Sequence, residues 1–196
     1  MRLFHLTMAS ALLGLAITPL LDAQRSGARA DVGVVRFPNS GARAAQAPFL
    51  RGIAQLHNFE YREAAAAFQQ AERADPSFAL PYWFEALTHS PILWRIDDPP
   101  AARAVLARLG PTPAERLAKA ATPHERAFGA AVEAFYADTD LTTRTKLFAD
   151  SLTALARRDT TDLEAAAFGA LGDLMYVDQR DVPAKARDAY GRGGIA

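Results

Sequence analysis

The chain has no cysteine among its 196 residues. This absence excludes disulfides, catalytic thiols and cysteine-ligated metal sites, although it leaves the cellular compartment open. Basic and acidic residues balance at 22 each, so no excess of positive charge points to nucleic acid or to an acidic lipid surface. We therefore expect no nucleic-acid partner.

The sequence also lacks the short motifs that most often carry chemistry. It has no Gly-x-Ser-x-Gly or Ser-x-x-Lys motif for a nucleophile, and no Gly-x-Gly-x-x-Gly or P-loop motif for a nucleotide. Its histidines follow no metal-binding spacing such as His-x3-His or His-Glu-x2-His. We therefore expect no cofactor, no bound metal and no enzymatic activity. A hydrolase built on solvated Glu and Asp residues is the less favoured alternative.

The N-terminus has the layout of a secretory signal peptide. Arg2 and His5 precede the apolar run Met8–Leu21, and the small residue Ala23 follows at the predicted cleavage position. The alternative is an uncleaved anchor, but the run is shorter than the roughly 20 residues that a membrane-spanning helix needs. We therefore predict that residues 1–23 are removed on export, that the mature chain has no stable membrane insertion, and that the protein is periplasmic or secreted.

A linker and then a helical pattern follow the predicted signal peptide. Residues 24–47 are rich in turn formers and predict a linker or leader. One helical face runs through Phe49–His57 and a second through Glu60–Ala74, where Asp75-Pro76 ends the helix. Two short helices, a tight turn and a proline stop predict a helix hairpin, and a new helical pattern starts near Ser77.

Capping residues mark the later helix starts. Asp98 precedes two prolines, and Thr-Pro-x-Glu capping boxes begin at Thr112 and Thr122. Thr161 repeats the capping-box spacing with a glutamate three residues later. We therefore predict a repeat domain over residues 48–193, with helix hairpins at about 49–74, 77–109, 123–158 and 161–190.

The first hairpin resembles the tetratricopeptide repeat, a helix–turn–helix unit of about 34 residues. The small and aromatic residues that carry the resemblance are Gly52, Ala64, Phe68, Ala71 and Pro76. Small side chains at Gly52 and Ala64 predict a close approach of the two helices. More broadly, the chain resembles a group of exported bacterial tetratricopeptide proteins. The resemblance implies an all-α, right-handed superhelical solenoid whose concave groove binds extended peptides.

The densest cluster of unusual residues lies between Tyr82 and Arg95 and includes both tryptophans of the chain. Aromatic anchors beside an arginine are typical of protein interfaces, so the cluster predicts a recognition patch. Core packing is the alternative, and it is the one we favour for Trp83. The candidate binding residues are His57, Trp83, Glu85, His89, Trp94 and Arg95.

These observations favour a scaffold that binds a protein or peptide partner in its groove. The chain closes on Gly191–Ala196 without a predicted capping helix, whereas repeat arrays usually need a polar terminal repeat. One explanation is that the chain is the N-terminal fragment of a longer exported protein whose ligand-binding or catalytic site lies beyond residue 196. The other is a homodimer formed through the last hairpin, and of the two the fragment is favoured.

Overall fold

The computed structural model describes residues 33–94, 96–137 and 139–181. These residues form α-helices and one short 3-10 helix, and no strand occurs among them, so the all-α prediction is confirmed for this part of the chain. In chain order the elements are α2 (Arg43–His57), α3 (Tyr61–Ala74), α4 (Leu80–Leu87), η1 (Ile92–Trp94), α5 (Pro99–Leu109), α6 (Pro113–Ala118), α7 (Pro123–Phe135), α8 (Leu141–Arg158) and α9 (Leu163–Asp181).

Parts of the predicted organisation lie outside the described residues. These are the signal peptide at 1–23, the start of the leader, Arg95, and the second helix of the fourth hairpin at 183–190. Within the described ranges, no helix combines the length and the apolar character needed to cross a bilayer.

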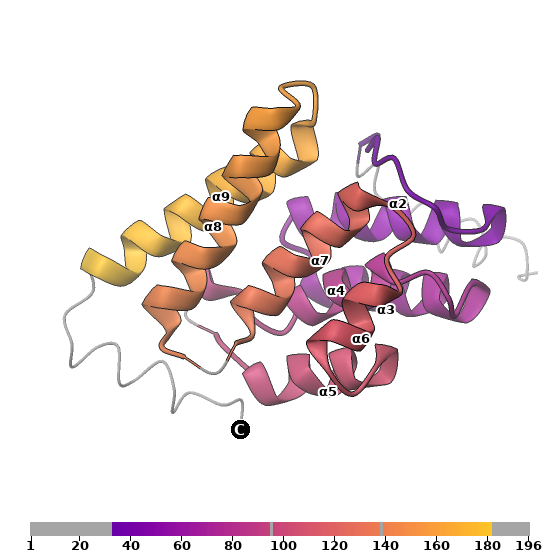
Figure 1. Ribbon diagram of the computed structural model, residues 1–196, viewed down its shortest axis with the longest axis horizontal. Coiled ribbons are helices and arrows are strands. Elements are labelled where there is room, and N and C mark those ends of the chain that lie inside the picture. The colour runs from indigo at the N-terminus through magenta and orange to yellow at the C-terminus, as the bar shows by residue number, and fades with distance from the viewer. Residues whose placement is uncertain (1–32, 95, 138, 182–196) are drawn as a thin grey trace, which may run out of the picture. The chain divides into compact units, whose positions relative to one another are not determined.

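Helices that follow one another in the chain pack side by side (Figure 1). The contacts pair α2 with α3, α4 with α5, α7 with α8, and α8 with α9. Helix α4 also contacts α3 and α7, while the short helix α6 lies against α7. Because α4 joins three other helices, its residues occupy the centre of the packing, and all of them except Leu87 are buried.

Aromatic side chains fill the centre of the hydrophobic core. Phe49, Phe68 and Phe84 are at most 1% exposed, and the Phe68 and Phe84 rings stack with their centroids 5.9 Å apart. Phe37 precedes α2, yet its ring lies 4.9 Å from that of Phe128 in α7. The segment before α2 therefore contributes to the hydrophobic core.

Two glycines permit the closest helix contacts. A Cβ atom on Gly52 would lie 2.5 Å from a ring carbon of Phe68, so the close approach predicted at Gly52 is confirmed. The same arrangement recurs between α7 and α4, where a Cβ atom on Gly129 would lie 2.6 Å from the ring of Trp83. In both places the glycine leaves room for a buried aromatic ring.

Most of the predicted helix starts are confirmed. The Asp98 carboxylate accepts a hydrogen bond from the Ala101 N–H at 3.0 Å, and the hydroxyls of Thr112 and Thr122 accept from the third residue after each. The capping box at Thr161 is wrong. Asp162 caps α9 instead, because its carboxylate accepts from the Ala165 N–H at 3.0 Å, while the Thr161 hydroxyl donates to Asp159.

The first helix begins earlier than the sequence predicts. Helix α2 starts at Arg43, inside the segment predicted as a linker, and continues through Pro48. Alanines favour this extension because they have the highest helix propensity, and Ala45 is also completely buried. Pro48 lies inside the helix, where it removes one hydrogen bond and its ring crowds the carbonyl four residues earlier, so the burial of Ala45 and Phe49 outweighs this cost.

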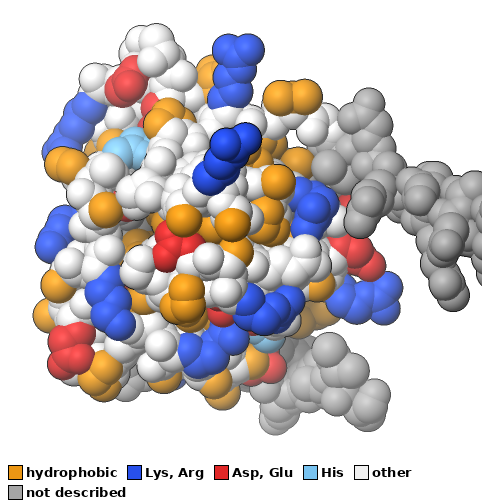
Figure 2. All heavy atoms as spheres, turned by 90° about the vertical axis from the view of Figure 1, so that its right-hand side faces the viewer, with side chains coloured by type: hydrophobic (Ala, Val, Ile, Leu, Met, Phe, Trp, Pro, Cys, Tyr) orange, Lys and Arg blue, Asp and Glu red, His pale blue; other side chains and the backbone are white. Residues whose placement is uncertain are grey.

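The charged side chains are mixed on the surface. Figure 2 shows one face of the molecule, on which Lys and Arg side chains are interspersed with Asp, Glu and hydrophobic groups. Among the described residues of that face, no side chains of a single sign gather into a stripe. Charge therefore marks no binding site among the described residues of this face.

Candidate functional site

An apolar pocket lies where the helices converge. Its volume is about 430 Å³, counting the space that is open to solvent. The lining comes from α2, α3, α4, η1, α7, α8 and α9, together with one residue of the connection after α4. The lining residues are Leu56, Tyr61, Leu87, Ser90, Leu93, Phe135, Phe148, Phe168, Leu171 and Met175.

Three aromatic rings form a cluster at this pocket, and we call Phe59, Tyr61 and Trp94 the aromatic rim. The Phe59 and Trp94 rings are 4.8 Å apart between centroids, and the Tyr61 ring lies 5.9 Å from that of Trp94. Tyr61 also lines the pocket. Phe59 and Trp94 are 42% and 52% exposed, so the rim presents aromatic surface to solvent beside an apolar pocket.

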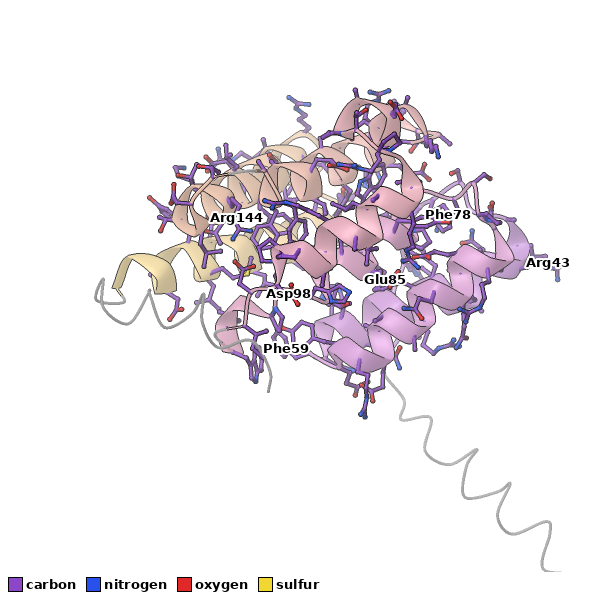
Figure 3. All side chains as sticks on the ribbon, turned by 90° about the horizontal axis from the view of Figure 1, so that it is seen from below. Arg43, Phe59, Phe78, Glu85, Asp98 and Arg144 are labelled. Carbon is purple, nitrogen blue, oxygen red and sulfur yellow. The ribbon has the colours of Figure 1, made fainter. Side chains whose placement is uncertain are left out.

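Phe59 has an unusual backbone conformation. Its φ is +61°, and it follows α2 at a position where glycine is the common residue. The Phe59 N–H donates to the Leu56 carbonyl at 3.0 Å and the Glu60 N–H donates to the Gln55 carbonyl at 2.9 Å, which is the hydrogen-bond pattern of a Schellman motif. A bulky side chain in this region costs about 1–2 kcal/mol. Figure 3 shows the Phe59 side chain at the edge of the molecule.

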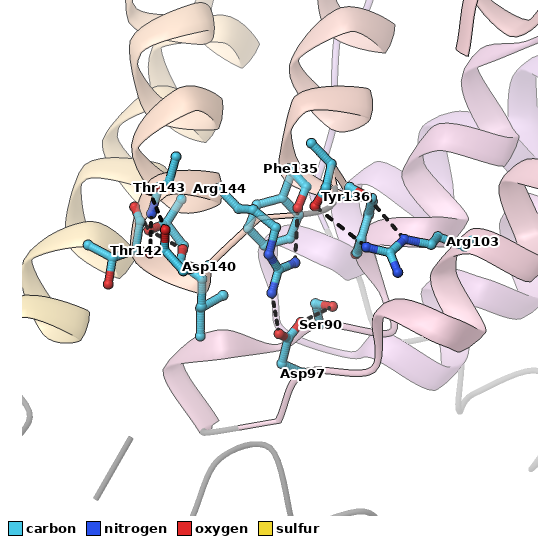
Figure 4. A network of polar contacts seen from close by, with 12 residues as sticks. Ser90, Asp97, Arg103, Phe135, Tyr136, Asp140, Thr142, Thr143 and Arg144 are labelled. Atoms are coloured by element: carbon cyan, nitrogen blue, oxygen red, sulfur yellow. Dashed lines mark hydrogen bonds and ion pairs between the residues drawn. The ribbon is translucent and has the colours of Figure 1, made fainter. Parts of the chain in front are cut away.

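The polar side chains of the pocket and the aromatic rim differ in whether they have hydrogen-bond partners. The Ser90 hydroxyl donates to Asp97 at 2.8 Å, and Asp97 pairs with Arg144 at 2.5 Å (Figure 4). In contrast, no hydrogen bond joins the Tyr61 hydroxyl or the Trp94 indole N–H to another described residue. Burial raises the pKa of Tyr61 to about 12, so its hydroxyl keeps the proton at neutral pH. The aromatic rim therefore carries two available hydrogen-bond donors.

Two histidine pairs attach the start of α9, which supplies one wall of the pocket. His57 of α2 pairs with Glu164 at 2.7 Å, and His124 of α7 pairs with Asp162 at 2.8 Å. The His57 ring also lies 4.8 Å from the ring of Phe168, a lining residue. The two pairs connect the N-terminal end of α9 to α2 and to α7, which are far from it in the sequence. They therefore hold this wall of the pocket in position.

A second polar cluster lies away from the pocket, between α3, α4 and α5. Arg108 pairs with Glu72 at 3.2 Å and also with Glu85, which accepts a further hydrogen bond from Gln69 at 2.8 Å. Both carboxylates are buried, and Glu85 lies between the helices in Figure 3. Burial and then the hydrogen bond shared with Glu85 raise the pKa of Glu72 to about 9. The two buried carboxyl groups share a single arginine, and Glu72 therefore keeps its proton at neutral pH.

This proton makes stability depend on pH. The unfolded chain releases it near pH 4.5 and the folded chain near pH 9, so the folded state binds more protons between these values and the free energy of unfolding falls as pH rises. Glu72→Gln replaces the protonated carboxyl by a neutral amide. We expect it to raise the free energy of unfolding at pH 8 by about 1 kcal/mol or more. The gain should vanish toward pH 4, and urea unfolding across this range measures it.

The matched control is Glu63→Gln on the same helix, where the carboxylate is solvent-exposed. Because the hydrogen bond from Arg62 lowers the pKa of Glu63, this carboxylate stays ionised above about pH 5, and the variant should keep the wild-type pH dependence from there to pH 8. An unchanged slope in Glu72→Gln would mean that Glu72 is ionised in the folded state.

The structure separates the candidate binding residues predicted from the sequence. Trp94 belongs to the aromatic rim, and His57 lies beside the pocket through its contact with Phe168. Trp83 and Glu85 are buried in the polar networks of α4, as favoured for Trp83. The half-buried His89 does not line the pocket, and Arg95 lies outside the described residues.

A convergence of Glu60, Glu85 and His89 in a deep pocket would favour the hydrolase alternative. None of these three residues lines the pocket described above, and Glu85 is paired with Arg108 instead. Sequence reasoning also missed Phe59 as a site residue. The available signal was a bulky aromatic residue directly after Asn58, at a helix end where glycine is usual.

Comparisons of the chain with protein-family models, with curated proteins and with solved structures give no match.

Proposed function

We propose that the chain is a non-catalytic, tetratricopeptide-like scaffold, exported from a bacterial cell, that binds a protein partner at the pocket and aromatic rim. The observation that carries this proposal is an apolar pocket that opens beside exposed aromatic rings. Buried aromatic and aliphatic anchors dominate the energy of protein interfaces, and exposed apolar patches on soluble proteins often mark such interfaces.

The chemistry of the lining favours binding over catalysis. Tyr61 and Ser90 are its polar members, and the Ser90 hydroxyl already donates to Asp97. Among the described residues that line the pocket there is no histidine, carboxylate or lysine, so these residues supply no group suited to proton transfer near neutral pH.

Two further features support a repeat-like arrangement and export. Glycines face buried aromatic rings both in the first hairpin and between α4 and α7, at Gly52 and Gly129. Successive helices pack as hairpins in chain order. The basic and apolar pattern of residues 1–23 supports export by its resemblance to a signal peptide.

A pocket-filling variant tests the binding role. Leu171→Phe places a larger side chain in the pocket wall and is expected to reduce partner capture at least about tenfold, because a hot-spot anchor contributes about 2 kcal/mol or more and about 1.4 kcal/mol is a factor of ten. Capture is measured by pull-down from periplasmic and culture-supernatant extracts of the producing organism with the full chain as bait, followed by mass spectrometry.

Leu163→Phe is the control, since Leu163 lies on the same helix but is 75% exposed and outside the pocket lining. Thermal unfolding of both variants verifies that they are folded. Equal capture of every partner by the wild-type protein and folded Leu171→Phe would argue against binding at this pocket.

A further inference from the structure

We infer that the outer face of α9 pairs with the same helix of a second copy of this chain, in an antiparallel arrangement centred on Ala170. The inference concerns a surface outside the pocket and does not rest on the proposed function. It assigns a face, a direction and a register to the homodimer that the sequence raises as an alternative. The outer face consists of Leu163, Ala166, Ala167, Ala170, Leu174 and Val177.

Helix α9 has two apolar faces, and only one of them is buried. Phe168 and Met175 are buried on the inner side of the helix, where α9 contacts α8 and η1 (Figure 1). The outer face recurs at positions i, i+3, i+4, i+7, i+11 and i+14 on the opposite side, which is the spacing of a coiled-coil seam. Its large side chains reach the solvent, since Leu163, Leu174 and Val177 are 75%, 54% and 52% exposed. A helix that is apolar on both sides is ordinarily buried on both.

The outer face is symmetric about Ala170. Leu163 and Val177 lie seven residues before and after it, and Ala166 and Leu174 lie four residues before and after it. A two-fold dimer requires this kind of self-complementary patch, because the contact of residue i with j is repeated as j with i. In an antiparallel pair, Leu163 of one copy meets Val177 of the other. Each Leu174 meets the smaller Ala166, so a large side chain faces a small one.

The charge at the edge of the outer face favours the antiparallel direction. Asp173 is exposed and lies three residues after Ala170. In a parallel pair the two Asp173 carboxylates would lie at the same level of the dimer and repel each other. In an antiparallel pair they are offset by about 9 Å along the helix axis, close to the screening length at physiological ionic strength. Antiparallel helix dipoles also attract each other, whereas parallel ones repel.

The length of the outer face favours a second copy over the residues that follow α9. From Leu163 to Val177 the face extends about 21 Å along the helix. The helix that the sequence predicts at 183–190 would extend about 12 Å, little more than half of this length. A second α9 has the same length as the first and therefore covers the whole face.

Sedimentation equilibrium of the full chain tests the pairing. We expect a monomer–dimer equilibrium between about 1 and 500 µM, since a single helix pair buries less surface than a standard interface. Leu174→Asp places a carboxylate against the apolar face of the other copy and should raise the dimer dissociation constant at least about tenfold. Leu147→Asp is the matched control. Leu147 lies on α8, is 42% exposed and is not part of the outer face, so the dissociation constant should stay unchanged.

Both leucines are partly exposed, so both variants should stay folded, and urea unfolding of the dilute protein verifies this. A monomer at every concentration, or association that persists unchanged in Leu174→Asp, would overturn the inference. A monomer whose stability falls strongly in Leu174→Asp would also overturn it, in favour of a segment of the same chain that covers the outer face.

Cysteine crosslinking tests the direction and the register, since the chain has no cysteine of its own. Ala170→Cys should give a disulfide-linked dimer on oxidation with copper phenanthroline, because the two substituted positions meet at the two-fold axis. Leu163→Cys alone should not crosslink, since its two positions lie about 21 Å apart and a disulfide spans Cα atoms less than about 7 Å apart. An equimolar mixture of Leu163→Cys and Val177→Cys should crosslink. Crosslinking of Leu163→Cys alone would overturn the antiparallel arrangement.

Pairing and partner capture are measured separately. A monomeric wild-type protein that still captures a partner through the pocket would overturn the pairing and leave the proposed function intact. Leu163→Phe, the control for the pocket, keeps a large apolar side chain on the outer face and should remain dimeric.

Discussion

Replacing Glu133 with leucine is expected to lower the free energy of unfolding by about 3–5 kcal/mol, the range for breaking a buried ion pair from one side. Glu133 pairs with Arg116 at 2.5 Å, and both side chains are less than 10% exposed. The same carboxylate accepts a hydrogen bond from the Trp83 indole N–H at 2.9 Å. The substitution therefore leaves a buried guanidinium and a buried indole donor without their acceptor.

The loss is measured by urea unfolding, with Asp150→Ala as the control. Asp150 pairs with Lys146 on the surface of α8, where both side chains are about half exposed, so its removal should cost less than about 1 kcal/mol. Glu133→Gln, which retains an oxygen acceptor for Trp83, should be intermediate between the wild type and Glu133→Leu. Similar stability of Glu133→Leu and the wild type would show that Arg116 finds other partners at little cost.

Capping residues in the sequence were sufficient to predict where α5, α6 and α7 begin. Asp98, Thr112 and Thr122 each accept the backbone N–H expected from a cap, because this interaction involves only residues within one turn. The same reasoning failed at Thr161, where Asp159 and Asp162 compete for the same local hydrogen bonds. The Thr161 hydroxyl donates to Asp159 at 2.6 Å, and Asp162 becomes the cap.

Tertiary contacts determine the start of α2 and the environment of His124, which local sequence patterns do not predict. Helix α2 extends back to Arg43 because Ala45 and Phe49 both enter the core, although Pro48 and the nearby turn formers favoured a linker. His124 lies in the first turn of α7, and no nearby residue in the sequence indicates its contacts. It pairs with Asp162 at the start of α9 and packs against Phe37, and both contacts depend on the tertiary structure.

The candidate site was predictable only in part for the same reason. Trp94 stood out as a rare aromatic residue in a connection, and it does belong to the rim. Its neighbours in space, Phe59 and Tyr61, lie more than 30 residues earlier in the chain, so no local spacing unites the three. Glu85 was a candidate binding residue because it is a charged residue in an aromatic stretch. It pairs with Arg108 instead, and this contact depends on the position of α5, which local sequence does not indicate.

Replacing Arg144 with methionine is the second substitution with a large expected effect. Arg144 in the first turn of α8 donates to Asp97 at 2.5 Å and to the Phe135 carbonyl at 3.0 Å, and its side chain is 5% exposed (Figure 4). Methionine fills a similar volume but leaves Asp97 with the Ser90 hydroxyl as its remaining hydrogen-bond partner among the described residues. We expect a loss of about 3–5 kcal/mol in the free energy of unfolding.

A double-mutant cycle with Asp97→Leu separates the ion pair from simple loss of packing. The double variant has no unpaired buried charge, so it should be more stable than Arg144→Met by about 1–3 kcal/mol, whereas independent sites would make it less stable. The cycle also bears on binding, because Ser90 and Phe135 both contact this network and both line the pocket. Affinity for a partner captured in the pull-down should therefore fall in Arg144→Met and recover in the double variant. Additive losses in both stability and affinity would show that Arg144 and Asp97 act separately, and that the network does not hold the pocket wall in place.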